Sequence, residues 1–313
     1  MGKVIKKSTK KTSTQLSVRL GTLELANPVI TASGTFGYGL EFKAYMNIDN
    51  LGAIITKGLS LKPRKGNPGP RIVETPSGMI NAIGLANIGV EAFINEKLPL
   101  LKKTKTKIIA NIFGETVREY SELAKRLSDV EGVSALEINI SCPNVKKGGM
   151  SFGTDPKEAA RVVRAVRKAT RLHVMTKLSP NVSDIKQMVR SVESAGTDSV
   201  SLINTIPAMA INAETKRPVL GNVMGGLSGP AIKPVALRMV YEAASVATVP
   251  LVGIGGITTA VDAIEFILAG ASAVQIGTAS FITPSASESV VSGLKEYVKK
   301  NGDIKKLIGA LKV

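Results

Sequence analysis

The sequence predicts a single-domain (β/α)8 TIM barrel, because short apolar runs alternate with segments of helical periodicity along 313 residues. The apolar runs, which are the candidate strands, span residues 28–33, 53–57, 107–112, 135–140, 173–178, 199–204, 250–255 and 272–277. The candidate helices between them include residues 115–128, 156–169, 182–195, 231–247 and 259–269. Eight strands alternating with helices in a chain of this length is the count of such a barrel.

Each candidate strand ends in or beside a polar residue or a glycine. These residues are Ser33 with Gly34, Lys57 with Gly58, Asn111, Asn139, Lys177, Asn204 with Thr205, Gly255 with Gly256, and Gly277 with Thr278. Any one of them could be an ordinary turn residue, but buried lysines and asparagines are costly unless something satisfies them. Because these barrels build their active sites at the carboxyl ends of the strands, we expect the side chains to converge on one mouth.

Cys142 follows the candidate strand 135–140 and is the only cysteine in the chain. A lone cysteine is more often a small buried hydrophobe, but the polar neighbours Asn139, Ser141 and Asn144 argue against an apolar slot. The only histidine, His173, begins a strand away from the mouth and is interpreted as structural, and no cluster of metal ligands is visible. Cys142 is therefore the best candidate for proton transfer, with nearby cations favouring its thiolate.

The pairs Gly255–Gly256 and Gly277–Thr278 end the last two strands, where such barrels often hold a phosphate. The phosphate could belong to a sugar phosphate or to a flavin mononucleotide. Lys57 and Lys177 would supply positive charge for a substrate carboxylate or a reduced flavin. The asparagines at the mouth fit amides and ring nitrogens, as in a pyrimidine or an isoalloxazine.

Two loops are expected to cover the mouth. Residues 58–88 form the longest irregular stretch, rich in glycine and proline, and long loops in compact domains are usually functional. The loop after Cys142 is glycine-rich enough to act as a lid. Its residues of interest are Lys146, Lys147, Gly148, Gly149 and Gly153.

The chain is strongly basic, with 41 Lys and Arg against 24 Asp and Glu, a net charge of +17. Such a charge would suit nucleic acid or an anionic membrane. However, the basic residues are scattered and aromatic content is only 4%, so a solvated basic surface is preferred. We expect residues 1–16 to be a basic, flexible tail without an apolar face, and 17–313 to be the catalytic domain. A single cysteine and the lack of a secretory signal or membrane span favour a cytoplasmic location.

The chain resembles the class 1 dihydroorotate dehydrogenases from about residue 17 to its end, and its motifs occur in family order. The motifs are TKGLS (56–60), RKGNPGPRIVE (64–74), NAIGLAN (81–87), ANIFG (110–114), EINISCPN (137–144), TKLSP (176–180), INT (203–205), GGLSGPA (225–231), GIGG (253–256) and QIGTAS (275–280). NAIGL and TKGLS look most like the class 1B catalytic subunit.

The resemblance implies one FMN per chain and the oxidation of dihydroorotate to orotate in pyrimidine biosynthesis. Cys142 matches the base that removes a proton from carbon 5 of the substrate while a hydride leaves carbon 6 for the flavin. The positions that match flavin contacts are Ser33, Lys57, Gly58, Asn111, Asn139, Lys177, Ile203, Gly229, Gly255, Gly256, Gly277 and Thr278. Those that match orotate contacts are Lys57, Asn81, Ala82, Ile83, Gly84, Leu85, Asn139, Asn144, Asn204 and Thr205.

The resemblance also implies a partner. Class 1B enzymes pair with a second subunit that carries FAD and a [2Fe-2S] cluster and passes electrons to NAD, around a homodimer core in a heterotetramer. A chain with one cysteine cannot hold such a cluster itself. The membrane-bound class 2 enzymes are less similar, since they use serine as the base and carry an amphipathic amino-terminal extension.

The alternative enzyme is a tRNA-dihydrouridine synthase, which is also a flavin barrel with a catalytic cysteine and whose RNA would suit the +17 charge. That family appends a helical RNA-binding domain, whereas barrel elements occupy this chain almost to its end. A non-catalytic nucleic-acid binder on a barrel scaffold would have lost residues at the mouth, and they all stand in place. We therefore expect a small-molecule substrate and neither nucleic acid nor membrane as a partner.

Overall fold

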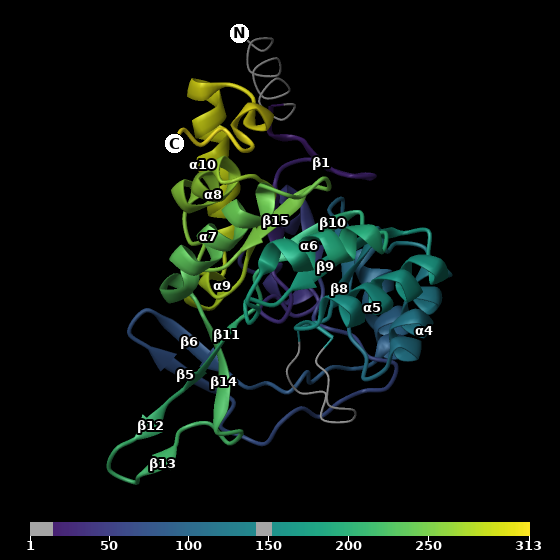
Figure 1. The fold of residues 1–313 in the computed structure, drawn as a ribbon, viewed down its shortest axis with the longest axis vertical. Coiled ribbons are helices and arrows are strands. Elements are labelled where there is room, and N and C mark those ends of the chain that lie inside the picture. Colours follow the sequence, from purple (N-terminus) through teal and green to yellow (C-terminus); the bar gives the residue numbers. More distant parts are fainter. Residues whose placement is uncertain (1–14, 142–151) are drawn as a thin grey trace.

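Eight parallel strands close into a barrel at the centre of the computed structural model, which describes residues 15–141 and 152–313. The strands are β3 (Val29–Thr31), β4 (Ala53–Ile55), β7 (Lys107–Ile112), β8 (Ala135–Asn139), β9 (His173–Leu178), β10 (Ser199–Leu202), β15 (Leu251–Ile254) and β16 (Ala271–Ile276). Their order around the barrel follows their order in the chain. Every strand expected from the sequence is present, so the predicted TIM barrel is confirmed (Figure 1).

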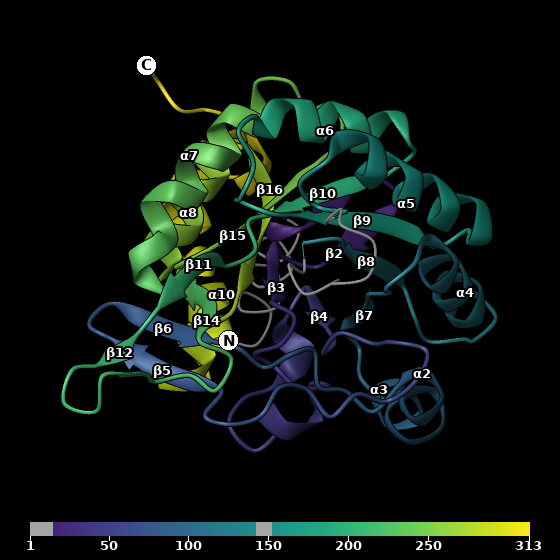
Figure 2. The ribbon, with the colours of Figure 1, turned by 60° about the horizontal axis from the view of Figure 1, so that its bottom comes forward.

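Helices surround the barrel strands (Figure 2). Those expected from the sequence are α4 (Val117–Ser128), α5 (Pro156–Ala169), α6 (Ile185–Ser194), α7 (Lys233–Ala244) and α8 (Ala260–Leu268). The side chains of Thr116, Asp155 and Asp184 accept hydrogen bonds from backbone N–H groups in the first turns of α4, α5 and α6. Thr259 and Asp262 form a capping box at the start of α8. Because each helix starts after a strand's carboxyl end, these caps fix the loops that form the mouth.

Shorter helical segments and one long helix complete the outer layer. The 3-10 helices are η1 (Leu40–Phe42), η2 (Ile48–Asn50), η4 (Pro230–Ile232) and η5 (Ile304–Leu307). The short helices α2 (Val90–Ala92) and α3 (Leu98–Leu101) are joined by the π-helical segment η3 (Phe93–Lys97). The last two helices are α9 (Ala279–Ile282) and the long α10 (Ala286–Asn301). The helix α10 packs against α8 and β3. Within the described ranges, no helix combines the length and the apolar character needed to cross a bilayer.

A four-stranded antiparallel sheet lies outside the barrel (Figure 1). In spatial order its strands are β11 (Ile206–Met209), β14 (Met224–Ser228), β6 (Gly78–Asn81) and β5 (Ile72–Thr75). The prediction that residues 58–88 are irregular is therefore wrong for the β5–β6 hairpin. These strands have only four residues each, and β6 depends on β14, which is far away in the sequence. A short strand whose partner is distant in the sequence has little local sequence pattern from which it could be predicted.

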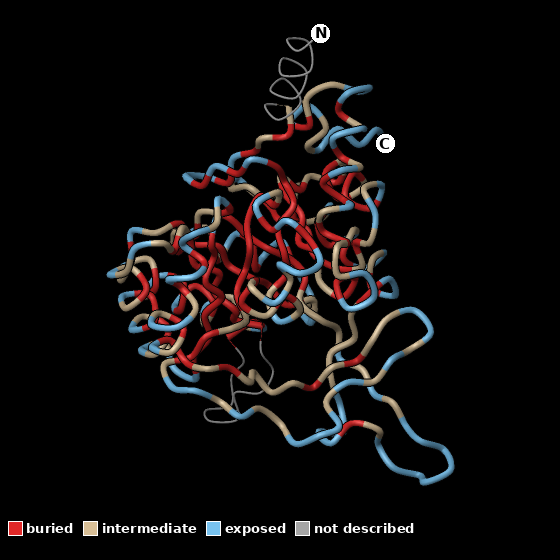
Figure 3. The backbone as a smooth tube through the Cα atoms, turned by 180° about the vertical axis from the view of Figure 1, so that it is seen from behind, coloured by how far each residue is buried: buried red, intermediate tan, exposed pale blue. Residues whose placement is uncertain are grey.

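Two small hairpins are separate from the barrel sheet, and the first of them packs against β16. They are β1 (Val18–Leu20) with β2 (Leu23–Leu25), and β12 (Ile211–Asn212) with β13 (Arg217–Pro218). The second projects from the four-stranded sheet and is exposed, in contrast to the buried barrel strands (Figure 3). Leu16 is 1% exposed and belongs to the main apolar core, so the folded part begins before the expected boundary at residue 17.

His173 begins β9 and is buried, as expected for a structural histidine. Its Nε2 lies 2.8 Å from Ser199 Oγ, and its Nδ1 lies 3.4 Å from Thr22 Oγ1. Burial lowers the pKa of His173 to about 4, while the nearby charges of Asp198 and Arg167 act in opposite directions on it. The imidazole is therefore neutral in the folded protein at neutral pH.

The low pKa of His173 predicts that the protein loses stability in mild acid. Between pH 6.5 and 4 the unfolded chain binds a proton at this residue and the folded protein does not, so stability falls as the pH falls through this window. The loss is on the order of 3 kcal/mol. Denaturant unfolding at several pH values should show it in the wild type but not in His173→Gln. Equal pH dependence in both proteins would contradict this account.

Candidate active site

The carboxyl ends of the barrel strands open into a cavity of about 680 Å³. The described residues that the family resemblance placed at the flavin or at orotate all line it. They are Ser33, Lys57, Gly58, Asn81, Ala82, Ile83, Gly84, Leu85, Asn111, Asn139, Lys177, Ile203, Asn204, Thr205, Gly229, Gly255, Gly256, Gly277 and Thr278. Cys142 and Asn144 lie outside the described residues, as do Lys146, Lys147, Gly148 and Gly149 of the expected lid. Ser141, immediately before Cys142, lines the cavity.

The charge in the cavity is positive. Lys57 and Lys177 are the charged side chains among its described lining residues, and no described aspartate or glutamate lines it. The Lys177 side chain is largely buried, and its Nζ lies 3.4 Å from Ser33 Oγ. Burying a cation is costly unless an anion compensates it. The cavity therefore favours an anionic ligand.

Amide side chains fix the ends of β8 and β10 relative to each other. Asn139 Oδ1 accepts hydrogen bonds from the backbone N–H of Ser141 at 3.3 Å and from Asn204 Nδ2 at 3.4 Å. Asn204 Oδ1 accepts from the backbone N–H of Thr205 at 2.8 Å. The hydroxyl of Tyr120 on α4 donates to the carbonyl of Asn139 at 2.8 Å. Since each amide has a fixed partner, the side of the cavity that they form is preorganised.

Asn111 at the end of β7 has an acceptor without a protein partner. The residue is fully buried, and its Nδ2 donates to Glu137 Oε2 at 2.6 Å, whereas its Oδ1 has no partner among the described residues. A Cβ on Gly58 would lie 3.0 Å from this Oδ1, so the glycine leaves space beside the oxygen. An unpaired buried acceptor costs about 1–3 kcal/mol, which a ligand N–H would recover.

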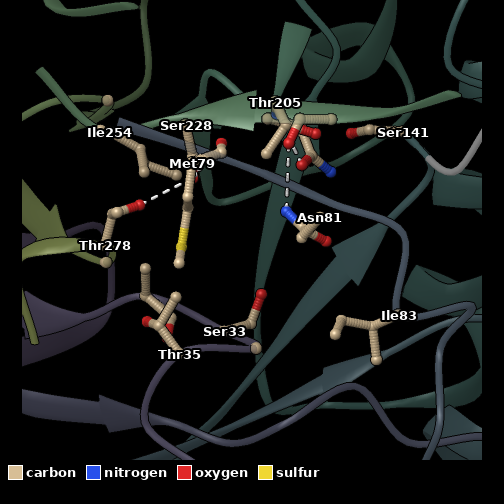
Figure 4. A pocket seen from close by; sticks show the side chains of 18 of the residues that line it. Ser33, Thr35, Met79, Asn81, Ile83, Ser141, Thr205, Ser228, Ile254 and Thr278 are labelled. Atoms are coloured by element: carbon tan, nitrogen blue, oxygen red, sulfur yellow. Dashed lines mark hydrogen bonds between the residues drawn. The ribbon is translucent and has the colours of Figure 1, made fainter. Parts of the chain in front are cut away.

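Glycines that follow β14 and β15 allow a close approach of several backbone segments. Gly229 and Gly256 have φ values of 94° and 70°, which favour glycine. A Cβ on Gly256 would lie 2.8 Å from the carbonyl oxygen of Gly229, and a Cβ on Gly229 would lie 2.7 Å from Gly78 Cα. Thr278 Oγ1 donates to Ser228 Oγ at 2.8 Å beside them (Figure 4). This end of the cavity has the composition of a phosphate site.

The loop after β15 contains Thr258, which lines the cavity. An ion-pair network fixes this loop. Lys233 Nζ lies 2.5 Å from Asp262 Oδ1 and 2.7 Å from Glu265 Oε2. Asp262 Oδ2 accepts from the backbone N–H and the hydroxyl of Thr258. Burial raises the pKa of Asp262, but the hydrogen bonds from Lys233 and Thr258 outweigh it and hold this pKa well below its usual range. The carboxylate thus stays ionised and fixes the loop.

The four-stranded sheet and the segment after β6 form another wall of the cavity. Asn81 Nδ2 donates to the carbonyl of Gly226 on β14 at 3.2 Å, and Figure 4 shows its side chain pointing towards Thr205. Asn67 Nδ2 donates to the carbonyl of Ala82 at 2.9 Å. The segment that begins at Asn81 is thus fixed on both sides, although it has little regular structure.

Several further residues that line the cavity were not predicted from the sequence. They are Asn181, Asn222, Met224, Gly225, Gly226, Ser228 and Thr258. The motif GGLSGPA contains three of them, but only Gly229 was assigned to the site, because local periodicity does not reveal that β14 pairs with β6. The motif itself was the signal that could have identified them.

The fold and the cavity define an (β/α)8 barrel built to hold an anionic, hydrogen-bonding ligand at its strand ends. A family model described as dihydroorotate dehydrogenase matches residues 15–298. The chain belongs to the dihydroorotate dehydrogenase family, and its relatives place it in class 1B.

Relatives named "Dihydroorotate dehydrogenase B (NAD(+)), catalytic subunit" include proteins from Geotalea daltonii and Trichlorobacter lovleyi. The protein from Geotalea daltonii is 57% identical over 300 residues, which cover 95% of this chain and 98% of the relative. The protein from Trichlorobacter lovleyi is 59% identical over 298 residues, with the same coverage. A crystal structure of DHODH from Eimeria tenella in complex with ferulenol has the same fold, with a TM-score of 0.79 at 22% identity over 95% of this chain and 88% of that one. The tRNA-dihydrouridine synthase alternative finds no support in these relatives.

Enzymes of this family depend on FMN, and the cavity fits such a group. Its volume is in the range of cofactor sites, and the lysines provide positive charge without an acidic neighbour in the described lining. The glycine-rich end suits a phosphate, and the partnerless oxygen of Asn111 suits a ring N–H.

The close packing at Gly256 predicts that Gly256→Ala weakens the binding of FMN by the flavin-free protein at least tenfold. The added methyl group would meet the carbonyl of Gly229 at the expected phosphate site. Gly302→Ala is the matched control, because Gly302 also has a positive φ, of 88°, but no atom within 4 Å of the added Cβ. Fluorescence titration with FMN measures both. Equal weakening in the two variants would contradict a role of Gly256 in the site.

Proposed function

We propose that this chain is the catalytic subunit of an NAD-linked dihydroorotate dehydrogenase, which oxidises (S)-dihydroorotate to orotate in de novo pyrimidine biosynthesis. The observation that carries the proposal is one cavity that combines Lys57, Lys177 and three strand-end asparagines with no described acidic side chain in its lining. Orotate is an anion with ring amides, so it matches both features. The names of the relatives from Geotalea daltonii and Trichlorobacter lovleyi agree with this activity.

In this proposal the cavity would hold one FMN per chain, which when bound would supply the acceptor for the hydride that leaves carbon 6 of the substrate. The residues that would hold it are Ser33, Lys57, Gly58, Asn111, Asn139, Lys177, Ile203, Gly229, Gly255, Gly256, Gly277 and Thr278. The glycines and Thr278 suit the phosphate, and Lys177 suits negative charge on the reduced ring.

The substrate would lie against the wall formed by the segment after β6. Its contacts would be Lys57, Asn81, Ala82, Ile83, Gly84, Leu85, Asn139, Asn144, Asn204 and Thr205. Lys57 would pair with the carboxylate, and the asparagine amides would bind the ring carbonyl and N–H groups. Because Asn139 and Asn204 are fixed by their own hydrogen bonds, they would hold the ring in one orientation.

Cys142 is proposed as the base, whose Sγ takes the proton from carbon 5. The described lining residues include no carboxylate and no imidazole that could do so. Ser141 lines the cavity next to Cys142 in the chain and is anchored by a hydrogen bond from its Oγ to the carbonyl of Lys177 at 2.8 Å. Cationic lysines in the cavity would favour the thiolate.

The electron acceptor and the assembly are also part of the proposal. The words "catalytic subunit" and "NAD(+)" in the names of the relatives support a partner subunit that carries FAD and a [2Fe-2S] cluster and reduces NAD. We further propose a homodimer core within a heterotetramer, a cytoplasmic location, and a basic amino-terminal tail that ends before Leu16, which belongs to the core of the catalytic domain.

The proposed base predicts that Cys142→Ala slows anaerobic reduction of the bound flavin by dihydroorotate at least a hundredfold, the usual scale for a general base. Stopped-flow absorbance of the oxidised flavin measures the rate. The visible spectrum of the variant before mixing is the control, since it shows that FMN is still bound. Bleaching at the wild-type rate would exclude Cys142 as the base, and a wild-type flavin that dihydroorotate never bleaches would exclude the substrate.

The proposed carboxylate contact predicts that Lys57→Met raises the dissociation constant for orotate at least tenfold, because the substrate loses a charged partner. Lys62→Met removes the same charge from an exposed side chain that does not line the cavity and should change it less than twofold. Titration of the flavin spectrum with orotate measures both. Similar effects of the two substitutions would show that only the overall charge matters.

A further inference from the structure

Glu137 is a fully buried carboxylate inside the barrel, and the proposed reaction gives it no role. It lies on β8, directly opposite Asn111 in the pairing of β7 with β8. Its Oε2 accepts a hydrogen bond from Asn111 Nδ2 at 2.6 Å. Its Oε1 accepts one from Ser201 Oγ at 2.9 Å and one from Gln275 Nε2 at 2.7 Å. Neutral donors from three strands thus surround this carboxylate.

The contact with Glu137 determines which end of the Asn111 amide faces the ligand. An ionised carboxylate only accepts hydrogen bonds, so it must face the NH2 group of the amide. The carbonyl Oδ1 of Asn111 is then left over, and it has no partner among the described residues. It lies beside Gly58, which also lines the cavity. Turning the amide would bring two oxygens together and leave a buried NH2 group unpaired.

We propose that Glu137 is a positioning residue that locks Asn111 as a hydrogen-bond acceptor and so makes the cavity select a ligand with an N–H group at this place. The inference rests on the proposed function, in which the ligand beside Asn111 is the flavin. An oxidised isoalloxazine carries one ring N–H, on its pyrimidine part, so an acceptor fixed at Asn111 distinguishes that edge of the ring from the others. Glu137 acts only through Asn111 and does not line the cavity among the described residues.

Electrostatics and positioning predict opposite effects when this carboxylate is removed. A buried anion near a cationic cavity repels an anionic ligand, so Glu137→Met would strengthen FMN binding if charge alone mattered. If Glu137 instead fixes Asn111, the same substitution frees the amide to turn and weakens FMN binding. The sign of the change therefore separates the two roles.

The test is fluorescence titration of flavin-free protein with FMN, together with thermal unfolding to show that each variant is folded. Glu137→Met should raise the dissociation constant at least tenfold. Ser201→Ala, which removes another donor to the same carboxylate and leaves Asn111 untouched, should change it less than threefold. Asn111→Asp should also raise it at least tenfold, because it places two carboxylates against each other.

The combination of Asn111→Asp with Glu137→Gln is the decisive variant. It exchanges the donor and the acceptor of this hydrogen bond, keeps the net charge and still presents an oxygen to the cavity. It should bind FMN within threefold of the wild type. The inference is wrong if the double variant does not fold, or if it binds FMN no more tightly than Asn111→Asp does. It is also wrong if Glu137→Met binds FMN as tightly as the wild type. A wild-type protein that does not bind FMN would instead overturn the proposed function.

Discussion

Closure of the parallel barrel is the constraint on which the rest of the structure depends. Because all eight strands run in the same direction and form a closed ring, their carboxyl ends open on one side. Residues as far apart in the chain as Ser33 and Thr278 therefore line the same cavity. The fold thus gathers lysines, amides and glycines that no local segment could bring together.

Polar groups inside the barrel differ in how the protein satisfies them. His173, at the amino end of β9, is buried with a partner for each ring nitrogen, and it contributes to stability. At the carboxyl ends, Lys57 and Lys177 have no described acidic neighbour in the cavity lining, and Asn111 Oδ1 has no described partner. A folded protein carries such costs where a ligand later compensates them. This difference separates the structural end of the barrel from the functional one.

The sequence predicted the barrel and the lining residues at strand ends well, because both depend on local patterns. Apolar runs identify strands, and the residue that ends each run lies at the mouth by topology alone. The β5–β6 hairpin was missed because β6 pairs with β14, which is far away along the chain. The role of Glu137 was equally invisible, since its partners Ser201 and Gln275 lie on distant strands. Alternation shows that a strand is present, but it does not show which polar residue will be buried.

We propose that the cavity holds a flavin through its phosphate at the glycine-rich ends of β15 and β16. Calorimetric titration of the flavin-free protein with FMN and with riboflavin tests it most directly, because the two ligands differ only by the phosphate. We expect one FMN per chain, bound at least a hundredfold more tightly than riboflavin. Equal affinity for the two, or no binding of FMN, would contradict it.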